Sequence, residues 1–217
     1  MTTKTSTTHI GSRPVCTRCT KPIPVCYCHT LTPIENSWPV IIIQHQSELG
    51  HAIGTAPIAQ LSLTQCQTLI QPKNPGQNEK SIDQQVAALL TQSLQPLLVY
   101  PDEQAKQLPQ LKQTAIRPLI FLDATWRKSR RLLHEFPELN KLEKIALHPP
   151  AASRYRIRKS TNKSGLSTIE AIAFTLGELE KNHNKYQPLL HSMDWIIDQQ
   201  VAAMGNEVYQ KNYAVKL

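Results

Sequence analysis

Short runs of continuous apolar residues, separated by segments of helical periodicity, constrain the fold of this chain more than any other feature. The stretches WPVIIIQH (38–45) and PLIFLD (118–123) are typical of strands that are buried on both faces. PLLVYP (96–101) and KIALHPP (144–150) are shorter runs of the same kind, and CQTLI (66–70) is a weaker candidate. Strands that alternate with helices form a parallel sheet with helices on both faces. We therefore predict an α/β fold around a parallel sheet.

Helical periodicity fills the intervals between these runs. Residues 81–95 place apolar side chains at helical spacing, and Asp102 is predicted to cap a further helix that Pro109 ends or kinks. A helix over 167–181 opens with the capping-box pattern Ser-x-x-Glu, and a final helix is predicted over about 188–208. The polar segment 151–166 is predicted to be a long loop, and such loops are usually either functional or disordered.

The net charge of the chain and the clustering of its cations indicate what kind of partner it binds. The 217 residues suit one domain, and 24 Lys and Arg against 16 Asp and Glu give a net charge of +8. The cations gather between Arg127 and Lys163, which favours an anionic partner such as nucleic acid over a merely cationic surface. The N-terminal segment lacks the apolar core of a signal peptide, and no apolar run approaches the roughly 20 residues of a membrane helix. We expect a cytoplasmic protein with reduced thiols.

Four of the five cysteines lie close together, in the pattern Cys16-x2-Cys19-x6-Cys26-x-Cys28. Four thiolates at such spacing suit a tetrahedral zinc ion without a position open for substrate, so the predicted role is structural. The alternative is two reducible disulfides or loosely held thiols, which a reducing compartment disfavours. The predicted organisation is a disordered tail (1–13), a four-cysteine zinc knuckle (14–30) and an α/β domain (31–217).

A carboxylate, an aromatic ring and a cationic cluster follow one another at the end of a predicted strand. Asp123 stands where ligands bind in parallel α/β sheets, although Asp123 or Thr125 could instead only cap the helix that follows. Trp126 suits stacking on a base or on adenine, and a half-buried core aromatic is the alternative. The cations suit phosphate contacts, or they form the solvated face of a helix; they are Arg127, Lys128, Arg130 and Arg131. A second set alternates along an extended segment, which puts its members on one side: Arg154, Arg156 and Arg158.

The segment DATW, which comprises Asp123, Ala124, Thr125 and Trp126, resembles the D-x-T-W signature of the DTW-domain family, the tRNA-uridine aminocarboxypropyltransferases. Four further resemblances occur in the family's order: the cysteine knuckle, QHQSELGHAIGTA, LLVYP and YRIRKSTNKSGLSTIEA. The four-residue signature is weak by itself, but the ordered set is specific and extends over most of the chain.

The resemblance implies a fold akin to the SPOUT class of RNA-modifying enzymes, with a C-terminal knot as a further expectation. It implies S-adenosylmethionine as the donor and transfer of the 3-amino-3-carboxypropyl group to N3 of a tRNA uridine. Methylthioadenosine would be released, and similar bacterial-type enzymes act at uridine 47 in tRNA numbering. Two alternatives stay open: an S-adenosylmethionine-dependent RNA methyltransferase, and a zinc-knuckle RNA-binding protein without catalysis.

The same resemblance implies roles for single residues. Asp123 is the candidate general base, because a carboxylate at a strand end can accept the proton of uridine N3–H. The start of the helix at Ser167 suits an anion, either the donor carboxylate or a phosphate, although the capping box alone also accounts for Ser167 and Glu170. The residues expected to support the cleft are His45, Glu48 and Thr55. Those expected to bind the donor are Thr125, Tyr155, Arg158, Leu166, Ser167, Thr168 and Glu170. Those expected to contact RNA are Trp126, Arg127, Lys128, Arg130, Arg131, Arg154 and Arg156.

Overall fold

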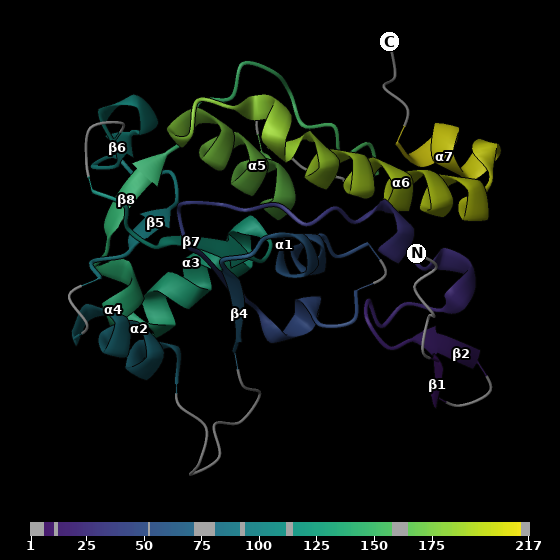
Figure 1. Ribbon diagram of the computed structural model, residues 1–217, viewed down its shortest axis with the longest axis horizontal. Helices are drawn as coiled ribbons and strands as arrows, with labels where there is room; N and C mark the ends of the chain where they lie inside the picture. The colour runs from purple at the N-terminus through teal and green to yellow at the C-terminus, as the bar shows by residue number, and fades with distance from the viewer. Residues whose placement is uncertain are drawn as a thin grey trace.

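A six-stranded parallel sheet forms the centre of the computed structural model, which describes residues 7–10, 13–51, 53–71, 81–91, 94–111, 115–157 and 165–213 (Figure 1). The strands lie in the order β4-β3-β7-β5-β8-β6, and each pairs with its neighbours in parallel. Their bounds are Val40–Gln44 (β3), Cys66–Ile70 (β4), Leu97–Val99 (β5), Lys106–Gln107 (β6), Leu119–Asp123 (β7) and Glu143–Ala146 (β8). The predicted α/β class and its parallel sheet are confirmed.

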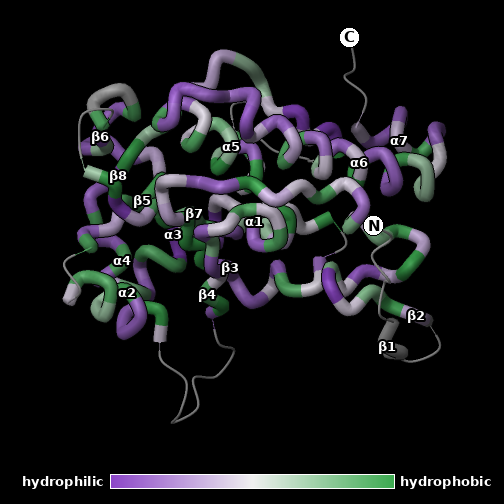
Figure 2. The backbone as a smooth tube through the Cα atoms, in the orientation of Figure 1, coloured by the Kyte–Doolittle hydropathy of each residue, from purple (hydrophilic) through white to green (hydrophobic). Residues whose placement is uncertain are grey.

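Helices cover both faces of the sheet. Alternate residues of each strand point to opposite sides, and the apolar side chains on each side pack against helices. Val40 and Ile42 belong to a core shared with one set of helices, and Ile41 and Ile43 to a core shared with the other. Figure 2 shows the hydropathy of this layered arrangement along the backbone. The first set comprises α1 (Ala56–Ser62), α5 (Thr168–Leu179) and α6 (Gln187–Met204). The second comprises α2 (Ile82–Thr91), α3 (Trp126–Glu135) and α4 (Pro137–Asn140).

Two predicted helices are wrong in part. Asp102 does not cap a helix: its carboxylate accepts the Gln104 N–H at 3.0 Å and its carbonyl the Ala105 N–H at 3.1 Å, which makes a turn. The edge strand β6 follows, and then a 3-10 helix over Leu108–Leu111. The final helix does not run through to 208, because Gly205 has a φ of +81° and divides it into α6 and α7 (Asn206–Asn212).

The cysteine-rich segment packs against the α/β domain. The strands β1 (Thr7–Ile10) and β2 (Arg13–Cys16) pair in antiparallel and include residues of the segment 1–13, for which a disordered tail is predicted. Short 3-10 helices follow at Ile23–Val25 and Cys28–Thr30. Tyr27 is fully buried in the same core as α5 and α6. Within the described residues, no helix is long and apolar enough to cross a membrane.

Candidate active site

A cavity of about 400 Å³ opens at the carboxyl ends of β5, β7 and β8, the edge at which ligands bind in parallel sheets. The starts of α3 and α5 close it from the side of the helices. Its lining is Val99, Tyr100, Pro101, Phe121, Leu122, Ala124, Trp126, Ser129, Ile145, Leu147, His148, Pro149, Leu166, Ser167, Thr168 and Ala171. Three residues expected to bind the donor, Leu166, Ser167 and Thr168, are therefore brought together here.

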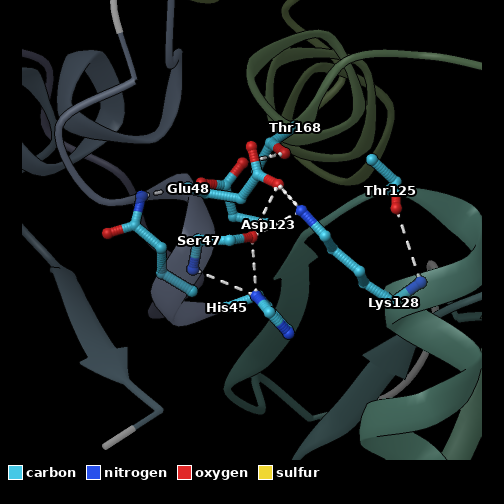
Figure 3. Close-up of polar contacts among 8 residues, drawn as sticks. His45, Ser47, Glu48, Asp123, Thr125, Lys128 and Thr168 are labelled. Atoms are coloured by element: carbon cyan, nitrogen blue, oxygen red, sulfur yellow. Dashed lines mark hydrogen bonds and ion pairs between the residues drawn. The ribbon is translucent and has the colours of Figure 1, made fainter. Parts of the chain in front are cut away.

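Asp123 ends β7 beside this cavity and is only 8% exposed. Its Oδ1 accepts the Thr168 hydroxyl at 2.7 Å and its Oδ2 accepts the Gln44 amide at 2.8 Å (Figure 3). Asp123 is not among the described residues that line the cavity, whereas Leu122, Ala124 and Thr168 are. The carboxylate thus lies one layer behind the wall, and the Thr168 hydroxyl connects the two.

The DATW turn leads from β7 into α3. Thr125 is the N-cap of α3, and its hydroxyl accepts the Lys128 N–H at 3.4 Å. Of the two candidates for this cap, Thr125 has the role and Asp123 does not. Trp126 occupies the first position of the helix and lines the cavity, with its ring 6.0 Å from that of Tyr100. Its indole Nε1 is buried without a hydrogen-bond partner in the described part of the chain, so it can donate to a ligand.

The predicted capping box at the start of α5 is confirmed. The Ser167 hydroxyl accepts the Glu170 N–H, and the Glu170 carboxylate accepts the Ser167 N–H at 2.8 Å. The same carboxylate also accepts the Ser153 hydroxyl at 2.8 Å and the Arg154 N–H at 2.6 Å. Glu170 is buried and holds the arginine segment to α5, so its contacts in the structure are with protein groups; donor binding by Glu170 remains a prediction.

The cations expected to contact RNA fall into two classes. Lys128 pairs with Glu48 at 3.0 Å and donates to Ser47 (Figure 3), and Arg131 pairs with Glu135 at 2.6 Å. The segment around Arg154 and Arg156 pairs with α6, through Asp194 and Asp198 respectively. In contrast, the side chains of Arg127 and Arg130 have no hydrogen bond or ion pair with another residue that the structure describes. Arg158 lies outside the described residues.

The residues expected to support the cleft lie in and after the loop that follows β3. The His45 N–H donates to the Asp123 carbonyl at 3.1 Å, and its Nδ1 accepts the Ser47 N–H at 3.1 Å. Burial and the nearby Lys128 ammonium lower the pKa of His45, which favours the neutral ring. Thr55 is buried before α1, and the Tyr155 hydroxyl donates to the Ile53 carbonyl at 2.8 Å. Tyr155 thus holds this loop and is not among the lining residues described above.

The four clustered cysteines bring their sulfur atoms within 4.8 Å of one another. The Cys16 and Cys28 sulfurs are 3.7 Å apart and those of Cys19 and Cys26 3.6 Å, so all four are free thiols. The cluster is compatible with a zinc ion. Lys21 donates to the His51 carbonyl at 2.6 Å, and this contact fixes the knuckle to the loop after β3.

Several residues at this edge of the sheet are not predicted by any motif in the sequence. Gln44 binds the Asp123 carboxylate from the end of β3, and Leu147 and His148 line the cavity after β8. Both segments follow predicted strands, and the carboxyl ends of parallel strands lie on the same side of a sheet. Knowledge of the strand order would therefore have predicted that these residues lie near Asp123.

The fold and the cavity define an α/β protein with a candidate ligand site at the carboxyl ends of its parallel strands. At this site the end of β7, with Asp123, lies close to the starts of α3 and α5. The chain belongs to the DTW domain family, whose model matches residues 13–201. It is similar to tRNA-uridine aminocarboxypropyltransferase 2 of Mus musculus, with 25% identity over 96% of this chain and 70% of the relative. The enzyme of the same name from Drosophila melanogaster is 27% identical over 93% of this chain and 80% of the relative. That of Macaca fascicularis is 27% identical over 83% of this chain and 61% of the relative.

Proposed function

We propose that this protein transfers the 3-amino-3-carboxypropyl group from S-adenosylmethionine to N3 of a tRNA uridine. The observation that carries the proposal is the cavity at the carboxyl ends of β5, β7 and β8, bordered by the DATW turn that the family's name denotes. The names of the three relatives support the same reaction. A SPOUT-like arrangement with a C-terminal knot, uridine 47 as the target and a cytoplasmic location stay predictions of this proposal.

The cavity suits the donor in size and lining. Its volume lies within the range of about 300–1,000 Å³ that is common for small-molecule sites. Apolar side chains such as Val99, Ile145 and Leu147 suit the adenosyl part of the donor. The buried Nε1 of Trp126 and the hydroxyl of Thr168 offer polar contacts that fix orientation.

The proposed reaction needs a group that accepts a proton. Uridine N3 forms a bond to the carbon of the aminocarboxypropyl chain next to sulfur. The carbon–sulfur bond breaks with its electron pair on sulfur, and methylthioadenosine leaves. The N3 proton passes to the Thr168 hydroxyl at the cavity wall, which in turn gives its own proton to Asp123. Asp123 is therefore the proposed base, acting through Thr168.

The decisive experiment incubates the protein with S-adenosylmethionine and unmodified tRNA, and then measures nucleosides by mass spectrometry. We expect a uridine that carries an aminocarboxypropyl group, together with an equal amount of methylthioadenosine. A methylated nucleoside with S-adenosylhomocysteine would assign the chain to RNA methylation. Binding of tRNA without any modified nucleoside would favour a non-catalytic RNA-binding protein.

The proposal includes a structural zinc ion at Cys16, Cys19, Cys26 and Cys28. Four sulfurs at about 2.3 Å from a tetrahedral ion lie about 3.8 Å apart, close to the observed 3.6 and 3.7 Å. Metal analysis of the purified protein should give one equivalent of zinc, and its chelation should lower the temperature of unfolding. A metal-free protein with unchanged unfolding and transfer would contradict the zinc site.

A further inference from the structure

A second cleft of about 500 Å³ lies outside the cavity described above. Three segments that are distant in the sequence form it: the end of the cysteine knuckle with the residues after it, the arginine segment, and the start of α6 with the 3-10 helix His183–Tyr186 before it. Except for one proline, the residues that line it carry polar side chains, and none of these lining residues is Asp or Glu. The Thr30 hydroxyl donates within the protein, to the Tyr27 carbonyl at 2.8 Å. The other lining side chains that can donate to a ligand are Thr32, Arg154, Asn184, Gln187 and His191.

Arg154 is held at this cleft by one contact of its side chain and one of its backbone. Its side chain pairs with Asp194 on α6, and its backbone N–H donates to Glu170 at 2.6 Å. The side chain is still 51% exposed. A guanidinium has five N–H donors in a planar fork, so pairing with one carboxylate leaves donors for a second anion.

We propose that this cleft binds a phosphate of the tRNA backbone beside the modified nucleotide, and this inference rests on the proposed function. A phosphodiester is acceptor-rich and negatively charged, which complements a cleft of donors whose one cation, Arg154, keeps guanidinium N–H groups beyond the one that pairs with Asp194. The net charge of +8 favours the same ligand.

The cleft and the cavity share one scaffold. Glu170 binds both Ser167, which lines the cavity, and the N–H of Arg154, whose side chain lines the cleft. One capping box therefore fixes the position of the cleft relative to the cavity. A tRNA strand that places its uridine in the cavity can extend its backbone to the cleft, and this second anchoring point sets the register of the strand.

A charge placed in the cleft tests this inference. Gln187→Glu puts a carboxylate among the donors, and Glu is well tolerated in the first turn of a helix, so the variant should fold. The matched control is Gln210→Glu on the exposed face of α7, which changes the net charge by the same amount. We expect Gln187→Glu to raise the Kd for tRNA about ten-fold or more, and Gln210→Glu less than about two-fold. Both variants should bind S-adenosylmethionine like the wild type.

Equal effects of the two variants on the Kd for tRNA, or no effect of either, would overturn the inference. Titration with inorganic phosphate and with polyglutamate separates other anions. Weaker phosphate or polyglutamate binding in Gln187→Glu, with tRNA binding unchanged, would assign the cleft to a free anion or to an acidic protein segment. The outcome is distinct from that of the proposed function. If the wild type transfers the group and Gln187→Glu binds tRNA normally, the cleft proposal is wrong and the proposed function stands. If Gln187→Glu selectively weakens tRNA binding but the wild type transfers nothing, the cleft proposal stands and the proposed function is wrong.

Discussion

The two helices that start at the cavity, α3 and α5, have N-termini with the same backbone conformation but with side chains of opposite charge at the third helical position. Thr125 before α3 and Ser167 before α5 are both extended, with φ, ψ of −68°, 157° and −70°, 162°. In each case the hydroxyl accepts the N–H of the third helical residue at 3.4 Å. That third residue is Lys128 in α3 and Glu170 in α5.

The third position decides what each helix start does. Glu170 completes a capping box and places a negative charge at the positive end of the helix dipole. Lys128 can do neither, and Arg127 and Arg130 add further positive charge to the start of α3. A cation in the first turn of a helix, such as Arg127, costs the helix about 0.3–1 kcal/mol. The start of α5 therefore provides a stable wall, whereas the start of α3 carries the positive charge that the proposed contacts with phosphate need.

Asp123 joins the two helix starts, because it precedes α3 in the chain and accepts the Thr168 hydroxyl of α5. Asp123→Asn is expected to have the largest effect, a loss of about 10²–10⁴-fold in the rate of transfer. Asn keeps both contacts, since its oxygen can accept from Gln44 and its amide can donate to the Thr168 oxygen, so the fold should persist. The measurement is single-turnover transfer with saturating tRNA and donor.

Thr168→Val separates a relay from a direct base. Val has nearly the shape of Thr and removes the hydroxyl between the cavity and Asp123. If the proton passes through Thr168, this variant should lose transfer as severely as Asp123→Asn, with tRNA affinity unchanged. Transfer by Thr168→Val near the wild-type rate would show that Asp123 acts directly, or not as a base.

The capping box predicts the next largest effect, on stability. Glu170→Ala leaves four protein groups without this acceptor: the Ser167 N–H and hydroxyl, the Ser153 hydroxyl and the Arg154 N–H. We expect the free energy of unfolding to fall by about 3 kcal/mol or more, measured by urea denaturation. The matched control is Glu207→Ala, an exposed carboxylate on α7, which should stay within about 0.5 kcal/mol of wild type. A similar small change in Glu170→Ala would remove the contrast between the two helix starts.

The two helix starts also show what could be predicted from the sequence. The capping box and the buried strands are local patterns, so Ser167, Glu170 and β7 were correctly predicted. The pairs Gln44–Asp123 and Glu48–Lys128 join residues 79 and 80 positions apart, and no local pattern predicts them. The helix expected after Asp102 failed for the same reason: pairing of β6 with β8 outweighs local propensity.

The positive charge at the start of α3 should strengthen the binding of tRNA and make it depend on salt. Arg127 and Arg130 have no ion pair with another described residue, so they are the cations of α3 best able to meet phosphate. Arg127→Ala with Arg130→Ala should reduce the slope of log affinity for tRNA against log salt by about one for each phosphate that is no longer neutralised. Arg131→Ala is the control, since Arg131 pairs with Glu135. An equal change in slope from Arg131→Ala would assign the effect to general charge.

The smallest effect is expected at the caps themselves. Thr125 is exposed and makes one long hydrogen bond, so Thr125→Ala should lower the free energy of unfolding by about 0.5 kcal/mol, the low end for a cap. Ser167→Ala removes a buried hydroxyl that also donates to Glu170 at 2.6 Å, so a loss nearer to about 2 kcal/mol is expected. Urea denaturation of both variants with a common slope gives the difference directly. Equal losses would mean that the third residue, Glu170 or Lys128, does not set the strength of the cap. The contrast would then lie in charge alone, and Lys128→Gln, which can complete a capping box with Thr125, would leave the stability of α3 unchanged.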